Sequence, residues 1–294
     1  MPAEFPKITL ITPVFNQEVY LEETILSVLN QGYPNLEYII VDGASTDRTV
    51  SIIEKYSANL SSWVSEKDNG LYDALQKGFQ RSTGEIMGWL NADDILHRKS
   101  LFTVADIFEN NRELNWLQGY PTVIDATGRI VDHRKQRSSK YSFYLKSYRD
   151  GVFIQQESTF WRRNLWEKAG AEISRKYKYA GDFELWMRFF RYADLVETDA
   201  LIGAFRMRNS GQLSVVHYDE YLSECDRIID AEIATLPSAD KETLRKLERN
   251  RDKRLKYSWL PGSIQDKLFG PNICPSPVKL KFNRKRNSFT PTGV

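Results

Sequence analysis

The stretch EIMGWLNADDILH, residues 85–97, joins an apolar run to two adjacent carboxylates. Its first half, Glu85–Asn91, is expected to form a β-strand, and Asp93 and Asp94 follow directly. Two neighbouring carboxylates repel each other, so the pair gives no benefit to a buried strand end by itself. A divalent cation with oxygen ligands is a partner that would make such a pair useful.

Apolar strand patterns alternate with helical patterns on the N-terminal side of this stretch. Asn16 is expected to cap the first helix, because Asn is a preferred residue at that position. This order predicts a doubly wound α/β sheet, in which parallel strands are covered on both faces. The expected strands are residues 7–14, 36–41, 61–66 and 85–91, and the expected helices follow residues 16, 49 and 70.

Polar residues cluster where these strands end. Ligands of open α/β sheets bind outside the carboxyl ends of the strands, so these residues predict a ligand site. The alternative is that they are ordinary turn and cap residues. The residues concerned are Thr12, Asn16, Asp42, Glu66, Asp68, Asn91, Asp93 and Asp94.

The glycine patterns exclude two common nucleotide sites. The chain contains neither GxGxxG nor GxxxxGK, so dinucleotide cofactors and P-loop chemistry are poorly supported. Paired acids after a strand suit Mg²⁺, whose remaining ligands are often substrate phosphates. Such a cation would make a diphosphate a better leaving group.

Composition is that of an ordinary globular protein. The 294 residues are 41 % apolar and 27 % charged, with a formal net charge of +2. Cys225 and Cys274 form no CxxC pair, which favours a reducing compartment. We recognise no signal peptide and no run of about 18 apolar residues. These features predict a cytoplasmic protein that meets a membrane only from the side.

Four motifs in order resemble family 2 glycosyltransferases of the GT-A fold. They are TLITPVFNQEVYLEETILSVLNQGYPNLEYIIVDGASTDRT, SEKDNGLYDALQKGFQRSTGEIMGWLNADD, QQESTFWRRNLWEKAG and YAGDFELWMRF, and they span roughly residues 7–215. The resemblance implies a Rossmann-like, mostly parallel sheet flanked by helices, and a metal-dependent, hexosyltransferase-like enzyme that inverts the anomeric carbon. The QxxRW motif of processive synthases is missing, which favours transfer of one sugar per visit.

The resemblance also implies residue roles at the donor site. NADD matches the DxD metal motif, with Asp93 and Asp94 expected to bind Mg²⁺ or Mn²⁺. Asn91 stands where aspartate is usual, which lowers the local negative charge. Arg208 stands where the family often has histidine and is expected to contact the diphosphate; His217 is a weaker alternative. The expected nucleotide and donor contacts are Thr12, Pro13, Asn16, Asp42, Asp68, Lys77, Asn91, Asp93 and Arg208.

The catalytic base is expected to be Asp182, from YAGDFELWMRF. It would take the proton of an acceptor hydroxyl; the alternative is a simple helix N-cap. Glu184 and Trp161 are weaker candidates for acceptor contacts. A solvated position for Glu184 and a core position for Trp161 are the alternatives.

The C-terminal region changes character. We expect a catalytic domain over residues 1–215, a helical extension over 216–260 and a basic Pro- and Gly-containing tail over 261–294. From Asp240 to Val294 there are 14 Lys or Arg against 5 Asp or Glu. Contact with an anionic membrane is one interpretation, and a solvated helix pair with a flexible tail is the other. Nucleic acid is not expected as a partner.

Together these features predict transfer of a sugar from a UDP-, GDP- or dTDP-sugar to a hydroxyl of a glycan or lipid-linked glycan. The expected setting is bacterial surface polysaccharide biosynthesis, in the cytoplasm or at the inner face of the membrane. The alternative is a non-catalytic, sugar-nucleotide-binding partner subunit of the same fold. A nucleotidyltransferase is less well supported, because its Gly-rich N-terminal loop is absent.

Overall fold

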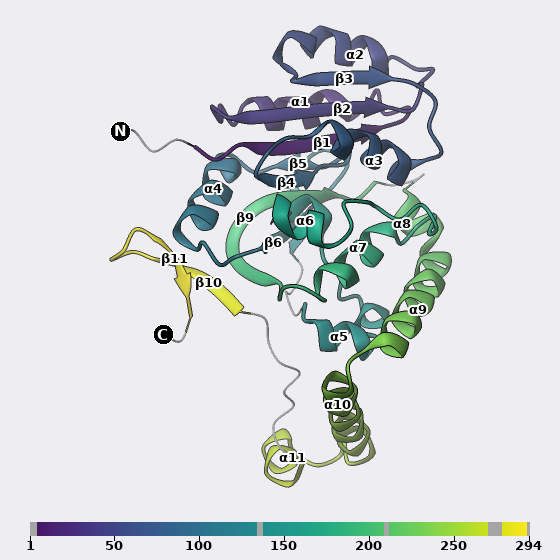
Figure 1. Ribbon diagram of the computed structural model, residues 1–294, viewed down its shortest axis with the longest axis vertical. Helices are drawn as coiled ribbons and strands as arrows, with labels where there is room; N and C mark the ends of the chain where they lie inside the picture. The colour runs from purple at the N-terminus through teal and green to yellow at the C-terminus, as the bar shows by residue number, and fades with distance from the viewer. Residues whose placement is uncertain (1–4, 134–137, 209–211, 270–277, 293–294) are drawn as a thin grey trace.

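The computed structural model describes residues 5–133, 138–208, 212–269 and 278–292. Most strands join one mixed sheet in the order β11-β10-β9-β6-β8-β4-β1-β2-β3 (Figure 1). Two short strands lie off this path, with β5 (Ile95–Leu96) pairing β9 and β7 (Ile130–His133) pairing β6.

The N-terminal half forms the parallel part of the sheet. The strands are β1 (Ile8–Val14), β2 (Leu36–Asp42), β3 (Ser62–Ser65) and β4 (Ile86–Trp89). They alternate with α1 (Leu21–Leu29), α2 (Thr49–Tyr56) and α3 (Leu71–Arg81), and a 3₁₀ turn (Ser57–Asn59) precedes β3. The β1–β2, β2–β3 and β1–β4 pairs are parallel, which confirms the predicted α/β arrangement.

The second half extends the same sheet. After α4 (Ser100–Asn110) come β6 (Trp116–Ile124), β8 (Thr159–Arg162) and β9 (Val196–Arg206). Strand β8 is antiparallel to both β4 and β6, whereas β9 is parallel to β6. The intervening helices are α5 (Lys140–Tyr144), α6 (Arg163–Lys168) and α7 (Gly181–Phe189), with 3₁₀ turns at Ser147–Asp150 and Gln156–Ser158.

Two hydrophobic cores cover the two faces of the sheet. Alternate side chains of a strand point to opposite faces, so Leu10 of β1 packs with α1 and α4, and Ile11 packs with α3. The α3 side also contains an aromatic cluster of Trp89, Trp161 and Trp186. The Trp89 and Trp186 rings are stacked with centroids 5.4 Å apart, and Trp161 lies edge-on to both. This cluster fixes α7 against the sheet.

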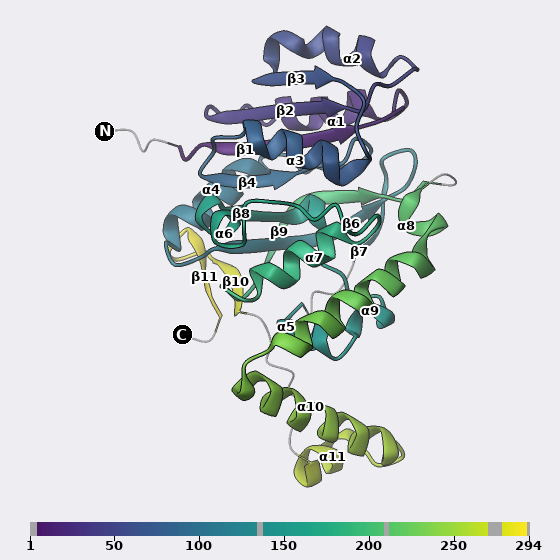
Figure 2. The same cartoon turned by 45° about the vertical axis from the view of Figure 1, so that its right-hand side comes forward.

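The C-terminal region is helical and then returns to the sheet. It contains α8 (Leu213–Val216), α9 (Tyr218–Thr235), α10 (Ser238–Lys256) and α11 (Gly262–Phe269). Figure 2 shows α9 running alongside α7, with α10 and α11 projecting beyond the body. Strands β10 (Val278–Asn283) and β11 (Ser288–Pro291) form a hairpin, and β10 pairs in parallel with β9.

Two expectations therefore need correction. Residues 261–294 are not simply a tail, because β10 and β11 belong to the main sheet. Asn16 does not cap α1, which begins at Leu21 after Tyr20. Asn16 instead has a φ of 49° in the loop after β1. Within the described residues, no helix combines the length and apolarity that a membrane span requires.

Candidate active site

The loops after β1 and β2 are joined at the carboxyl edge of the sheet. The backbone N–H of Asn16 donates to Ser45 Oγ at 2.8 Å, and Asn16 Oδ1 accepts from the Thr46 N–H at 2.9 Å. Asp42 accepts from the backbone N–H of Ser45 and from the hydroxyls of Ser45 and Ser65. These bonds fix the floor of the candidate site.

Three of the expected nucleotide contacts are covered by protein. Thr12 is fully buried, with Oγ1 3.0 Å from the Tyr38 hydroxyl. Pro13 is also buried, within β1. Asp42 is 0 % exposed, and its carboxylate accepts from Ser45 of its own turn and from Ser65 at the end of β3. These side chains support the loops that border the site, and contact of these residues with a nucleotide stays a prediction.

Asp68 and Lys77 remain close to this edge. A Cβ on Gly43 would lie 2.7 Å from Asp68 Oδ2, so the Asp68 carboxylate packs closely against the loop after β2 and would have to shift if residue 43 carried a side chain. Lys77 Nζ lies 3.0 Å from Glu66 Oε1 and donates to the Lys67 carbonyl at 3.1 Å. Lys77 of α3 thus holds the loop that carries Asp68.

Asp93 meets Arg208 at the end of β4. Arg208 Nε lies 3.0 Å from Asp93 Oδ2, and the two side chains are 17 % and 12 % exposed. Burial raises the pKa of Asp93, and the positive charge of Arg208 opposes that shift. Nearby, Oδ1 of Asn91 is buried and has no hydrogen-bond partner within the part of the chain that is described. A polar acceptor left in this state is suited to a ligand hydroxyl or cation.

Asp94 has a different role from Asp93. It is 1 % exposed, and its Oδ1 accepts from the backbone N–H of Arg206 at 2.9 Å. Its Oδ2 accepts from Gln156 Nε2 at 2.8 Å. Both oxygens are thus directed at the protein, and the prediction of Asp94 as a metal ligand is not supported. Asp94 joins the end of β4 to β9 and to the QQES segment.

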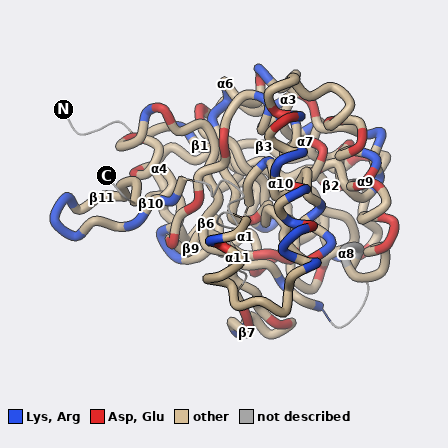
Figure 3. Tube along the Cα trace, turned by 90° about the horizontal axis from the view of Figure 1, so that it is seen from below, with Lys and Arg blue, Asp and Glu red and all other residues tan. Residues whose placement is uncertain are grey.

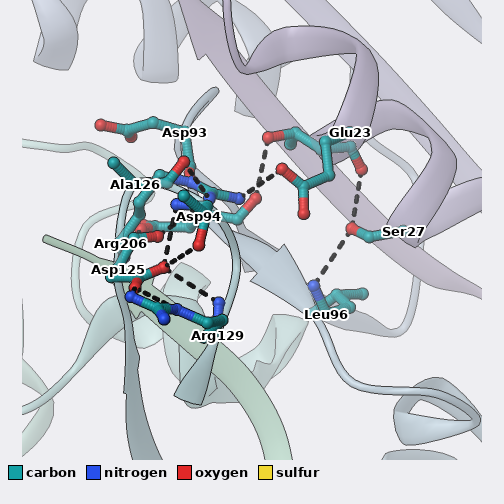
Figure 4. A network of polar contacts seen from close by, with 11 residues as sticks. Glu23, Ser27, Asp93, Asp94, Leu96, Asp125, Ala126, Arg129 and Arg206 are labelled. Carbon is teal, nitrogen blue, oxygen red and sulfur yellow. Dashed lines mark hydrogen bonds and ion pairs between the residues drawn. The ribbon is translucent and has the colours of Figure 1, made fainter. Parts of the chain in front are cut away.

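Arg206 is the centre of this junction (Figure 4). Its side chain is 0 % exposed, and Nη2 pairs with Glu23 of α1 at 2.7 Å. Its Nε donates to the Asp93 carbonyl at 2.6 Å, and its Nη1 donates to the Asp125 carbonyl at 3.1 Å. The guanidinium also lies over the Tyr20 ring, 4.9 Å from its centroid. One cation therefore connects α1, the acidic loop, the β6–β7 turn and β9.

Asp182 lies in the first turn of α7 and remains partly exposed. The Tyr72 hydroxyl of α3 lies 3.1 Å from Asp182 Oδ1 and 2.7 Å from the Tyr179 carbonyl. Burial raises the pKa of Asp182 to about 6, and the hydrogen bond from Tyr72 opposes the shift. A carboxylate with a pKa near neutrality is well suited to accept a proton.

The two acceptor candidates differ. Trp161 is 0 % exposed inside the aromatic cluster, so the prediction that it stacks on a sugar is wrong. Glu184 is partly exposed, and its Oε1 accepts from Arg188 Nε at 2.8 Å. Its Oε2 has no hydrogen-bond partner among the described residues, so its acceptor contact stays a prediction. His217 stacks on Tyr179 with ring centroids 4.5 Å apart.

Three residues of the site were not identified from the sequence. Tyr72 and Gln156 lie within motifs that matched, GLYDALQKG and QQES, but their partners are more than 60 positions away. Arg206 gave no signal, because it resembles any polar residue near the end of a strand. A buried arginine becomes recognisable only when its partners are placed in space.

Comparison with known proteins places the chain in a family. Residues 9–170 match the model described as glycosyl transferase family 2. The chain belongs to glycosyltransferase family 2. An uncharacterised glycosyltransferase of Rickettsia prowazekii is 26 % identical over 205 residues, covering 65 % of this chain and 60 % of that protein. TuaG of Bacillus subtilis, named for teichuronic acid biosynthesis, is 36 % identical over 92 residues, which are 30 % of this chain and 36 % of TuaG.

Solved structures show the same fold. TarS residues 1–349 of S. aureus in complex with UDP-GlcNAc superimposes with a TM-score of 0.64 at 20 % identity, covering 90 % of this chain and 78 % of that one. The mannosyltransferase PcManGT of Pyrobaculum calidifontis, in complex with GDP-Man and Mn²⁺, gives a TM-score of 0.53 at 17 % identity, covering 92 % and 86 %. The GT-A fold inferred from the motifs is confirmed.

The residues after β4 fit a divalent cation, but they supply fewer oxygen ligands than a complete protein metal site would. Asp93 is the one carboxylate of the NADD motif that is not committed to backbone or amide groups, and the Asn91 oxygen lies in the same segment. No group of three or more His, Cys, Asp or Glu among the described residues forms a complete protein cage. One carboxylate supplemented by substrate phosphates is a common arrangement for Mg²⁺.

Replacing Arg206 with methionine is expected to destabilise the fold by about 3 kcal/mol, because buried carbonyls and Glu23 lose their partner. Urea unfolding followed by tryptophan fluorescence measures this change. Arg129→Met is the matched control, since Arg129 is 79 % exposed and pairs with Asp125 at the surface. If the two variants lost equal stability, the central role of Arg206 would be contradicted.

Proposed function

We propose that this protein is an inverting, metal-dependent glycosyltransferase that uses a nucleotide-diphosphate sugar. The observation that carries the proposal is Asp182, a partly exposed carboxylate with a pKa of about 6 that is held by a phenol rather than by an ion pair. It stands at the position of the base in the YAGDFELWMRF motif. Membership of family 2 supports the reaction class.

Asp182 acts on the acceptor in this scheme. Its carboxylate takes the proton of an acceptor hydroxyl while the hydroxyl oxygen bonds to the anomeric carbon. The bond from that carbon to the diphosphate breaks, and its electron pair leaves with the nucleoside diphosphate. A single displacement from the opposite face inverts the anomeric configuration.

Asp93, Asn91 and Arg208 act on the donor. Asp93 would hold Mg²⁺ or Mn²⁺, which when bound neutralises charge on the diphosphate leaving group. Arg208 now pairs with Asp93, and its guanidinium would contact phosphate oxygens once the donor is present. Asp68, Lys77 and Asn16 border the same edge of the sheet and are proposed to line the nucleotide site.

The donor is proposed to be a UDP-, GDP- or dTDP-sugar. The complexes of TarS with UDP-GlcNAc and of PcManGT with GDP-Man support this class without selecting one nucleotide. The acceptor is proposed to be a hydroxyl of a glycan or lipid-linked glycan in surface polysaccharide assembly, which the name of TuaG supports. Such an acceptor places the enzyme in the cytoplasm, with peripheral contact at the inner face of the membrane through its basic C-terminal region.

Nucleotide release tests the donor class. Incubation with a panel of UDP-, GDP- and dTDP-sugars plus Mg²⁺ or Mn²⁺ is expected to release one nucleoside diphosphate, measured by chromatography. EDTA should abolish the release, because without a cation the Asp93 carboxylate would repel the diphosphate and nothing would neutralise the charge on the leaving group. Binding of a sugar nucleotide without turnover, with every cation and a range of acceptors, would instead favour the non-catalytic partner subunit.

Asp182→Asn is expected to lower kcat by at least about a thousandfold, because an amide cannot take the proton, and to leave the donor Kd nearly unchanged. In the unmodified enzyme, kcat should fall as the pH drops through about 6, where Asp182 becomes protonated. Stopped-time transfer assays and donor titrations measure both quantities. Asp106→Asn, a matched acid on α4 whose pKa is also raised by burial, should have normal activity. Normal transfer by Asp182→Asn would show that another group is the base.

A further inference from the structure

The α10–α11 hairpin exposes large apolar side chains at its far end. Leu255, in the last turn of α10, and Trp259, in the turn that follows this helix, are 66 % and 75 % exposed. Ile264 and Leu268 of α11 are 42 % and 62 % exposed and share one helical face. Exposed apolar side chains are ordinary one at a time, but four within 14 residues form a candidate contact surface.

The same hairpin is strongly basic. Between residues 245 and 269 the chain has eight Lys or Arg against three Asp or Glu. Viewed from below, Lys and Arg lie along most of α10 (Figure 3). Lys253 and Lys256 are both exposed and lie beside Leu255 in sequence. Basic residues therefore surround the apolar ones.

Among the described residues, the contacts that hold the hairpin to the body come from α10, and they include a hydrogen bond from Arg251 Nη1 to the Leu145 carbonyl at 3.1 Å. Leu244 is buried in the core on the α7 side of the sheet, and Asp240 accepts from the Tyr141 hydroxyl at 2.6 Å. At the far end, Gln265 Nε2 donates to the carbonyls of Tyr257 and Leu260, and Arg254 pairs with Asp266. These contacts close the hairpin without using Trp259 or Leu268. Figure 1 shows that α10 and α11 extend away from the sheet.

We propose that the far end of the α10–α11 hairpin docks on an anionic phospholipid bilayer. Leu255, Trp259, Ile264 and Leu268 would enter the headgroup region, while the surrounding Lys and Arg meet lipid phosphates. Nucleic acid would use the charge, but it would leave the aliphatic side chains of Leu255, Ile264 and Leu268 exposed. The inference deepens the proposed function, because it would bring the enzyme to lipid-linked acceptors.

Vesicle sedimentation tests this surface with the full chain and no donor or acceptor, so the result does not depend on the proposed reaction. Vesicles with about 30 % phosphatidylglycerol should bind the protein, and phosphatidylcholine vesicles should not. Lys253→Gln with Lys256→Gln should weaken binding about thirtyfold, since each basic side chain contributes about a fivefold gain. Trp259→Ser with Leu268→Ser should weaken it about tenfold or more.

Ile130→Ser with Val131→Ser is the matched control, because these residues of β7 are 60 % and 54 % exposed at a distant place in the fold. This control should bind vesicles as the unmodified chain does. Failure to bind anionic vesicles, or equal binding by the Trp259 and Leu268 variant, would overturn the proposal. If light scattering shows a dimer that this variant loses, the surface binds a second copy of the chain. If the protein binds a duplex oligonucleotide tightly and does not bind vesicles, the surface binds nucleic acid.

A second, independent observation concerns the loop that precedes Asp182. The Glu224 carboxylate of α9 accepts from three consecutive backbone N–H groups: Lys178 at 3.0 Å, Tyr179 at 2.8 Å and Ala180 at 2.9 Å. Glu224 is 7 % exposed, and Arg227 Nη2 lies 3.6 Å from its Oε1. A buried carboxylate that accepts several N–H bonds is a strong restraint on a loop.

The opposite side of this loop is held by α3. Tyr72 reaches the Tyr179 carbonyl and Asp182, and a Cβ on Gly181 would lie 2.8 Å from the Tyr72 ring. The loop is thus fixed between Tyr72 and Glu224, and Asp182 follows it in the first turn of α7. We infer that Glu224 is a positioning residue for the proposed base, and this inference rests on the proposed function.

Charge supports this geometry. The titratable groups that face Asp182 are Tyr72 from α3 and Tyr221, Glu224 and Cys225 from α9. Burial is the main reason that the pKa of Asp182 is raised, and the negative charge of Glu224 raises it further. Neutralising Glu224 should therefore lower the pKa of Asp182.

Glu224→Gln should lower kcat about a hundredfold by misplacing the carboxylate, with the KM for the donor unchanged. It should also move the acidic limb of the kcat profile to lower pH. Glu224→Asp, which keeps the charge, should retain the position of that limb. Glu232→Gln is the matched control on the same helix, because Glu232 is equally buried but pairs with Arg191.

Glu232→Gln is expected to lose stability without any shift of the pH profile. An unshifted profile with normal kcat in Glu224→Gln would overturn the inference, provided that Asp182→Asn is inactive. Should Asp182→Asn transfer normally, the proposed base itself fails, and the two failures are thereby distinguished. If Glu224→Gln does not fold, Glu224→Asp tests the inference instead. Its shorter side chain should misplace the loop and lower kcat while the pH profile of kcat stays in place, and a normal kcat would overturn the inference.

Discussion

The buried guanidinium of Arg206 is the constraint on which the candidate site depends. A charge removed from water needs partners on every side, and Arg206 obtains them from Glu23, from backbone carbonyls and from the Tyr20 ring. Those partners belong to segments far apart in the chain. The acidic loop after β4 can therefore take its observed position only when α1 and β9 are already packed against it.

This junction explains how two adjacent aspartates coexist at the end of a buried strand. Asp94 is directed inward, where the N–H of Arg206 and the amide of Gln156 stabilise it. Asp93 is directed to the other side, where Arg208 provides a counter-charge. Asp94 thus has a structural role, and the binding role of Asp93 is part of the proposed function. A single carboxylate is left for a donor complex, which agrees with the asparagine at position 91.

Local sequence patterns were sufficient to predict the strands and helices of the first half of the fold, but they could not predict which way individual side chains point. The parallel strands and their helices follow from apolar runs and turn residues. Asp93 lies after the expected fourth strand, and Asp182 lies in the first turn of α7, while their roles stay predictions. Thr12, Asp42 and Trp161 were assigned to ligands because motif positions do not state which way a side chain points. Burial inside the aromatic cluster decided against stacking by Trp161, whereas Thr12 and Asp42 are buried in β1 and β2 and their nucleotide contacts stay predictions. Non-local pairing also escaped prediction, as the parallel contact of β10 with β9 shows.

Several residues on which the proposed site depends lie outside the segment that matches the family model, residues 9–170. Asp182, Arg206, Arg208 and Glu224 all follow it, yet each contacts or fixes a group within the candidate site. The N-terminal segment thus builds the sheet edge, whereas the later strands and helices set the position of the carboxylate and the cations around it. In sequence, α9 resembles an appendage to the fold. It nevertheless reaches the candidate site, because its buried Glu224 carboxylate accepts hydrogen bonds from the backbone N–H groups of the loop before Asp182.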